Sequence, residues 1–125
     1  MDKAELIGRT KTFALQILKF VERLPKTAGG RGIANQLIRS ATSIGANYRA
    51  ACRARSRTEF AAKLGTVAKE ADETVYWLEL VRDGGLLANA QIEPLLAEAH
   101  ELTAIFTSAR RTSAENQTSN VKHRT

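Results

Sequence analysis

An amphipathic pattern runs through residues 4–24, which read AELIGRTKTFALQILKFVERL. Inward-facing side chains recur there at steps of 4, 3, 4, 3 and 4 residues, as they do in a helix that packs in a bundle. This row consists of Leu6, Thr10, Phe13, Ile17, Phe20 and Leu24. A second row beside it consists of Ile7, Ala14, Leu18 and Val21. Two adjacent rows are wider than one partner helix covers, so the pattern predicts a helix with surplus apolar surface, ended by Pro25.

Two further helices are expected in the middle of the chain. The connection over residues 27–32 is rich in glycine and is predicted to be flexible, so the second helix is placed from Gly32 to Arg53. The third should begin at Arg57, because Ser56 and Glu59 match a capping box, and should end at Gly84 and its neighbour Gly85. The inward row of the second helix consists of Ile33, Leu37, Ala41, Ile44, Tyr48 and Ala51. The inward row of the third helix consists of Phe60, Leu64, Val67, Ala71, Thr74 or Val75, and Leu78.

A fourth helix is expected over residues 90–111, with the row Ile92, Leu95, Ala99, Leu102, Phe106 and Ala109. The remaining residues, 112–125, hold only one apolar side chain larger than alanine and are predicted to be a disordered polar tail. Four long helices with short connections predict an all-α, antiparallel up-down-up-down four-helix bundle over residues 1–111.

Composition points to an intracellular protein without bound groups. The single cysteine, Cys52, excludes an internal disulfide, and no apolar run reaches the length of a membrane span. We therefore expect a cytoplasmic protein with no membrane contact. His100 lacks the Glu-x-x-His spacing of a bundle metal site, because Ala97 stands three residues before it, and His123 lies in the tail. No cofactor, metal or catalytic residue is predicted, and an enzyme is not expected.

Charge divides the chain into two blocks. Between Arg23 and Lys69 there are ten Lys or Arg and one acid, whereas between Glu70 and Glu101 there are eight acids and one base. A basic block neutralises phosphates and releases their counterions, which favours binding of RNA or DNA. The alternative is that the two blocks pair with each other, within or between subunits.

Six basic residues are the candidate nucleic-acid-binding residues: Arg39, Arg49, Arg53, Arg55, Arg57 and Lys63. Arginine suits this role because its planar fork makes bidentate contacts with phosphate, although the same fork suits carboxylates. Tyr48 is the one aromatic side chain of the block that could stack on a base.

Surplus apolar surface on the first and third helices predicts a homo-oligomer. The predicted interface consists of Ile7, Leu18, Tyr76, Trp77 and Leu80.

The segments QLIRSATSIGAN (36–47) and RSRTEF (55–60) resemble the four-helix-bundle proteins encoded in intervening sequences of bacterial 23S ribosomal RNA genes. The likeness covers about residues 5–110. The residues that match the family pattern are Gln36, Arg39, Ser43, Ile44, Asn47, Arg55, Ser56, Glu59, Phe60 and Glu73. The chain departs from many relatives in having Ala50-Ala51 and Lys69-Glu70 where they carry Glu-Gly and Gly-Ser.

This resemblance implies a bacterial, cytoplasmic homo-oligomer whose assembly is a pentameric ring. It also implies a relation to the accessory protein of diversity-generating retroelements, a basic pentamer that partners a reverse transcriptase and nucleic acid. Because four matching polar residues flank core rows, we expect Asn47, Arg55, Glu59 and Glu73 to form a structural polar cluster.

Together these observations favour a non-enzymatic oligomeric bundle that binds nucleic acid or a nucleoprotein partner through its basic surface. The alternative is a structural scaffold or adaptor that assembles with another protein and does not bind nucleic acid.

Overall fold

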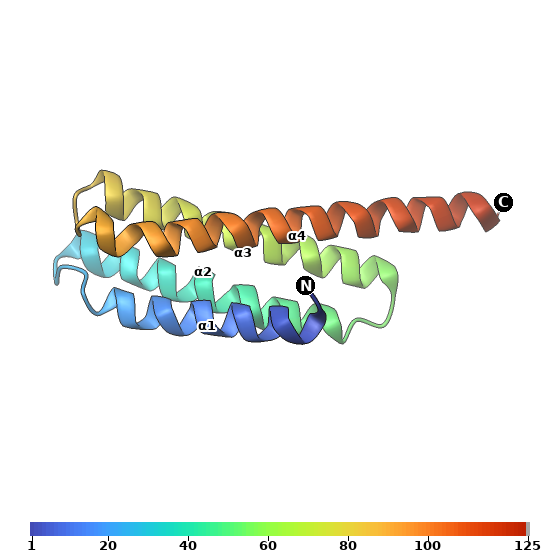
Figure 1. Ribbon diagram of the computed structural model, residues 1–125, viewed down its shortest axis with the longest axis horizontal. Helices are drawn as coiled ribbons and strands as arrows, with labels where there is room; N and C mark the ends of the chain where they lie inside the picture. The colour runs from blue at the N-terminus through green and yellow to red at the C-terminus, as the bar shows by residue number, and fades with distance from the viewer. Residues whose placement is uncertain (125) are drawn as a thin grey trace.

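The computed structural model describes the backbone of residues 1–124 and the side chains of residues 1–115. Its helices are α1 (Lys3–Val21), α2 (Ala28–Cys52), α3 (Arg57–Asp83) and α4 (Asn89–Arg124). They run alternately up and down beside one another (Figure 1). No strand occurs among residues 1–124. The predicted all-α, antiparallel up-down-up-down four-helix bundle is therefore confirmed.

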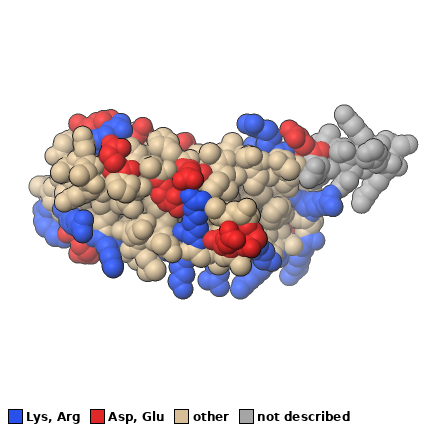
Figure 2. Space-filling view, viewed as in Figure 1, with Lys and Arg blue, Asp and Glu red and all other residues tan. Residues whose placement is uncertain are grey.

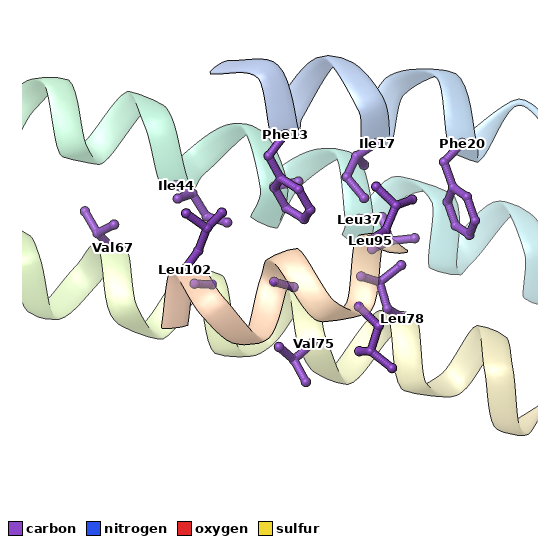
Figure 3. Close-up of a cluster of buried hydrophobic side chains, with 14 of the residues drawn as sticks. Phe13, Ile17, Phe20, Leu37, Ile44, Val67, Val75, Leu78, Leu95 and Leu102 are labelled. Carbon is purple, nitrogen blue, oxygen red and sulfur yellow. The ribbon is translucent and has the colours of Figure 1, made fainter. Parts of the chain in front are cut away.

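The core lies along the axis of the bundle and is made from the predicted inward rows. Phe13 and Ile17 of α1 have no exposed surface, and Leu102 and Phe106 of α4 are equally buried. Figure 3 shows such side chains from all four helices meeting between the ribbons. Each large side chain that is fully buried contributes about 1.5–3 kcal/mol, so these rows supply the main driving force for folding.

Helix α1 is capped at both ends by local contacts. The Asp2 carboxylate accepts a hydrogen bond from the Glu5 N–H at 2.8 Å, which satisfies one of the unpaired amides of the first turn. The helix ends at Val21 rather than at Leu24. A tighter turn follows, in which the Leu24 N–H donates to the Val21 carbonyl at 3.1 Å, and Leu24 is still buried.

Helix α2 begins at Ala28, so the predicted flexible connection over residues 27–32 is wrong. The Thr27 hydroxyl accepts from the Gly30 N–H at 3.1 Å and acts as the N-cap. Gly30 is buried, and a Cβ atom there would lie 2.0 Å from the Pro25 carbonyl oxygen. Glycine therefore allows the incoming chain to cross the first turn of the helix closely, and its role is close packing rather than flexibility.

Helix α3 begins and ends where the sequence predicts. Ser56 accepts from the Glu59 N–H at 3.0 Å, while the Glu59 carboxylate accepts from the Arg55 N–H at 3.2 Å, one residue before the predicted donor. At the other end Gly85 has a φ of +65°, which glycine adopts without strain. The Leu86 N–H donates to the Val81 carbonyl at 3.0 Å, the pattern of a Schellman cap.

Helix α4 continues to Arg124, so the predicted helix end at Arg111 and the disordered tail over residues 112–125 are corrected for residues 112–124. This stretch contains no glycine or proline to stop the helix, and each added residue contributes one more backbone hydrogen bond. Figure 1 shows α4 projecting beyond the ends of the other helices. Thr125 lies outside the described residues.

The helices do not contact one another equally. Helix α2 packs between α1 and α3, α3 packs along α4, and α1 meets α4 over only a short stretch. Arg9 bridges that weak contact: its Nε and Nη2 donate to the two carboxylate oxygens of Glu98 at 2.7 and 2.6 Å. Nη2 also lies 3.1 Å from the Glu101 carboxylate. The hydrogen bonds to Glu98 raise the pKa of Arg9, so this guanidinium stays charged.

Substitution of Gly30 tests the close crossing at the start of α2. We expect Gly30→Ala to lower the free energy of unfolding by about 2 kcal/mol or more, because the new methyl group meets the backbone of Pro25. Gly29→Ala is the matched control, since a Cβ there has nothing within 4 Å. It should raise stability by about 0.5 kcal/mol by restricting the unfolded chain. Urea unfolding followed by circular dichroism measures both, and equal effects of the two variants would contradict this account.

Substitution of Arg9 tests the bridge between α1 and α4. Arg9→Met keeps much of the side-chain volume but removes a bidentate ion pair and leaves Glu98 and Glu101 near each other without a cation. We expect a loss of about 1–2 kcal/mol at low salt, smaller at high salt because salt screens the interaction. Lys26→Met is the control, because Lys26 is exposed and has no salt bridge within the described residues. Chemical unfolding at two salt concentrations that gave identical midpoints for Arg9→Met and the parent would exclude a stabilising role.

Candidate nucleic-acid interface

A groove of about 670 Å³ runs between α1 and α2 and carries basic side chains on both sides. Lys3 and Lys11 of α1 stand on one side, and Arg49 of α2 and Arg53, which caps the end of α2, stand on the other. No carboxylate is among the described residues that line it. The other lining residues are Ile7, Thr10, Ala14, Thr42, Gly45, Ala46 and Cys52. The groove therefore combines mostly small, uncharged lining residues with a positively charged rim.

Small residues on α2 explain why this groove exists. Gly45 is buried, and a Cβ atom there would lie 3.2 Å from the Thr10 hydroxyl oxygen. The Thr10 hydroxyl donates to the Leu6 carbonyl at 2.8 Å, so it is satisfied within its own helix. The two backbones therefore approach closely beneath the groove, while the exposed Ala46 leaves space above it.

Five of the six predicted nucleic-acid-binding residues form no ion pair with any residue whose side chain the structure describes. Arg49, Arg53, Arg55 and Arg57 are exposed, Lys63 is half-buried, and none of them forms a salt bridge with a described carboxylate. They lie along the last turn of α2, the connection to α3 and its first turns. Figure 2 shows Lys and Arg side chains gathered along the lower edge of the molecule, toward the end where α1 begins. The cation of Arg49 in the last turn also suits the negative end of the helix dipole.

Arg39 differs from the other five because the acidic block already binds it. Its Nη1 donates to Glu70 at 3.0 Å and its Nη2 donates to Glu73. Burial alone would lower the pKa of Arg39, but Glu70 and Glu73 outweigh burial and raise it. Arg39 therefore joins α2 to α3 and is not available to a polyanion in the way that the other five are.

The four residues of the predicted polar cluster are not brought together, and this prediction is wrong. The Asn47 amide donates to the Ser43 carbonyl within α2, Arg55 and Glu59 form the cap of α3, and Glu73 pairs with Arg39. Because Glu59 and Glu73 both lie on α3, they are separated along its axis by roughly 21 Å at a rise of about 1.5 Å per residue.

Tyr48 is not placed to stack on a base. Its side chain is only 6% exposed, and its ring lies against Phe106 with the ring centroids 5.1 Å apart. Burial, together with Cys52 nearby, raises the pKa of Tyr48 to about 12. The tyrosine therefore belongs to the core, and any contact with nucleic acid has to be made by the basic side chains.

The charge pattern of the sequence did not identify Lys3 and Lys11 as binding residues. The net charge of residues 1–22 is small, because acids such as Asp2 and Glu5 offset the charge of the lysines. The signal was present in their spacing. Lys3, Ile7, Lys11 and Ala14 recur at steps of 4, 4 and 3 residues, which places them on one side of α1.

The predicted oligomer residues divide into two groups. Leu18 and Tyr76 are 40% and 53% exposed, whereas Ile7, Trp77 and Leu80 are half-buried within the chain. Leu15, which was not predicted, is 52% exposed. Large apolar side chains are therefore uncovered on α1 and α3, as the surplus rows on those helices predicted.

The described residues do not form two other kinds of site. Within them no group of three or more His, Cys, Asp or Glu side chains is arranged to hold a metal ion. In the same part of the chain, no helix has the length and apolarity needed to cross a membrane.

Comparison with known proteins identifies the family. A solved structure of a protein of unknown function from the S23 ribosomal protein family of Bacteroides thetaiotaomicron is similar to this chain, with 31% identity and a TM-score of 0.79. The match covers 89% of this chain and 99% of the other. A comparison with curated proteins gave no match. The model of a family described as 23S rRNA-intervening sequence protein matches residues 2–108, and the chain therefore belongs to this family.

Proposed function

We propose that this protein is a non-enzymatic homo-oligomer that binds nucleic acid, or a nucleoprotein partner, electrostatically through the groove between α1 and α2 and the adjoining corner. The observation that carries the proposal is the rim of four cations, Lys3, Lys11, Arg49 and Arg53, with no carboxylate among the described lining residues. Because these cations have no ion-pair partner within the described chain, a phosphate backbone can bind them without breaking an existing salt bridge.

Binding of this kind is largely independent of sequence. Lysine and arginine neutralise phosphates, and the release of condensed counterions drives association. Reading of bases requires side chains that reach base edges or stack on them, and Tyr48 is buried. We therefore expect similar affinity for RNA and DNA of different sequences, with a strong dependence on salt.

Oligomerisation strengthens the same mechanism. In a ring of identical subunits, of which a pentamer is the assembly that we expect, each basic groove recurs around the axis. A long polyanion that contacts several grooves gains effective concentration at each additional contact. Weak contacts of single subunits can then produce firm binding by the assembly.

A scaffold function is the second candidate, and one observation favours it. Arg39 of the basic block pairs with Glu70 and Glu73 of the acidic block, so the two blocks do attract each other within the chain. In a scaffold, the remaining basic residues would bind an acidic protein surface in the same way. Generic nucleic acid would then bind weakly even at low salt.

A variant with three substitutions tests the proposed binding surface. We expect Arg49→Ala, Arg53→Ala and Arg57→Ala together to weaken binding to labelled duplex DNA and to RNA of equal length. The slope of log K against log salt should fall by roughly 0.9 for each phosphate that the variant no longer neutralises. Fluorescence anisotropy over a salt series measures both quantities, and light scattering shows whether the oligomer is intact.

The matched control removes the same amount of charge from the other end of the bundle. Arg23, Lys26 and Arg31 are exposed and lie around the connection between α1 and α2. Their replacement by alanine should change the affinity much less. If both triple variants bound equally well, net charge would explain binding and the groove would not. No binding by the parent at low salt would favour the scaffold.

A further inference from the structure

Exposed apolar side chains mark one face on each of two helices. Among the described residues, the large exposed apolar side chains other than Met1 are Leu15 and Leu18 on α1 and Tyr76 on α3. Helices α1 and α3 lie diagonally across the bundle, without backbone contact between them. The two faces are therefore separate surfaces of one molecule, and no other part of the described chain covers these three side chains.

The face on α1 has a definite order of charges. In the direction from the end of the helix toward its start, it presents Glu22, Lys19, the pair Leu18 and Leu15, and Lys11. All five are exposed, and none of the three charged residues has a salt bridge within the described chain. The order is negative, positive, apolar, positive. We call these five residues the α1 stripe.

The face on α3 has the opposite order. In the direction of the chain it presents Lys69, Asp72, Tyr76 and Glu79, at steps of 3, 4 and 3 residues along one side of the helix. The first three are exposed, Glu79 is partly exposed, and none of the charged ones forms a salt bridge with a described residue. The order is positive, negative, apolar, negative. We call these four residues the α3 stripe.

We propose that the α1 stripe of one copy of this chain packs antiparallel on the α3 stripe of a second copy. In one register Leu15 meets Tyr76, Lys19 meets Asp72, and Glu22 meets Lys69. Lys11 then lies beside Glu79, so every charge on one stripe faces the opposite charge on the other. This inference rests on the homo-oligomer of the proposed function and names the surfaces that would form it.

Charge also selects the direction of packing. A parallel arrangement of the same stripes would place Lys11 against Lys69 and Glu22 against Glu79. Like charges held together across an interface are repulsive and suppress the wrong arrangement. The antiparallel arrangement is therefore favoured both by attraction within it and by repulsion in its competitor.

The position of the two stripes determines the kind of assembly. Because each copy carries both stripes on diagonally opposite helices, the contact is heterologous, and each copy can bind one neighbour through α1 and another through α3. Repetition of such a contact closes into a ring when the rotation permits. The proposed contact engages Lys11 of the groove rim with Glu79 of the neighbour, but it does not use Lys3, Arg49, Arg53 or Arg57. Those four cations therefore stay accessible to a polyanion.

Charge exchange between the stripes tests the register. Lys19→Glu and Asp72→Lys should each weaken self-association about tenfold, because each places like charges in contact. The double variant with both changes in one chain should recover the parent's association, since each exchanged residue then meets an exchanged partner on its neighbour. Lys26→Glu is the control and should leave association unchanged. Sedimentation velocity over a concentration series measures the effect, and circular dichroism checks that each variant is folded.

Mixing of two defective chains tests the heterologous geometry. Leu15→Asp removes the α1 stripe and Tyr76→Asp removes the α3 stripe, so each variant alone should be monomeric. A mixture should form a 1:1 dimer, because the intact α1 stripe of one variant can still bind the intact α3 stripe of the other. Light scattering measures the mass of each sample.

The outcomes separate this inference from the function on which it rests. A monomeric parent at micromolar concentration would overturn the oligomer itself. An oligomer that persisted in both single variants would overturn the proposed contact alone. Loss of assembly in Leu15→Asp with a normal assembly in Tyr76→Asp would indicate a contact between two α1 helices instead. Salt-dependent binding of duplex DNA, measured separately on the parent, tests the polyanion function independently of these results.

Discussion

Close packing of α2 against both of its neighbours is the constraint on which the rest of the bundle depends. On one side α1 approaches so closely that a Cβ atom at Gly45 would lie 3.2 Å from the Thr10 hydroxyl oxygen. On the other side the hydroxyls of Ser40 and Thr74, both fully buried, form a hydrogen bond of 2.8 Å between α2 and α3. A larger residue at Gly45 or at Ser40 would separate the helices. A hydroxyl left without a partner between α2 and α3 would lower the free energy of unfolding by about 1–3 kcal/mol. Helix α4 is then held chiefly by α3, and α1 chiefly by α2.

Much of the fold follows from the sequence because the period of the buried side chains is local information. The rows through Phe13, Leu37, Leu78 and Leu102 identify the helices and their inner faces without any knowledge of their neighbours. Glycine is less informative, because its freedom suits both a loop and a close crossing. The sequence therefore predicted flexibility at Gly30, where the structure has a tightly packed first turn.

The candidate site was harder to predict because pairing across helices depends on their relative rotation. Nothing in the spacing of Arg39 and Glu73, 34 residues apart in the chain, indicates that they form a salt bridge. The family pattern instead predicts Asn47, Arg55 and Glu59 as neighbours of Glu73, and the structure places them elsewhere. The basic corner between α2 and α3 was easier to predict, because several closely spaced arginines around a helix end cannot all be buried. Lys3 and Lys11 lie near this corner because α1 packs beside α2, and the charge pattern of the sequence does not reveal that packing.

Trp77 gives this molecule an internal optical probe. It is the single tryptophan of the chain, its indole nitrogen is shielded from solvent, and that nitrogen has no hydrogen-bond partner among the described residues. Its ring lies edge-on to the exposed ring of Tyr76, with centroids 5.1 Å apart. A shielded indole emits at shorter wavelengths than a hydrated one, and its emission responds to the polarity of adjacent groups. Events that cover or uncover Tyr76 should therefore be visible in the intrinsic fluorescence of the unlabelled protein.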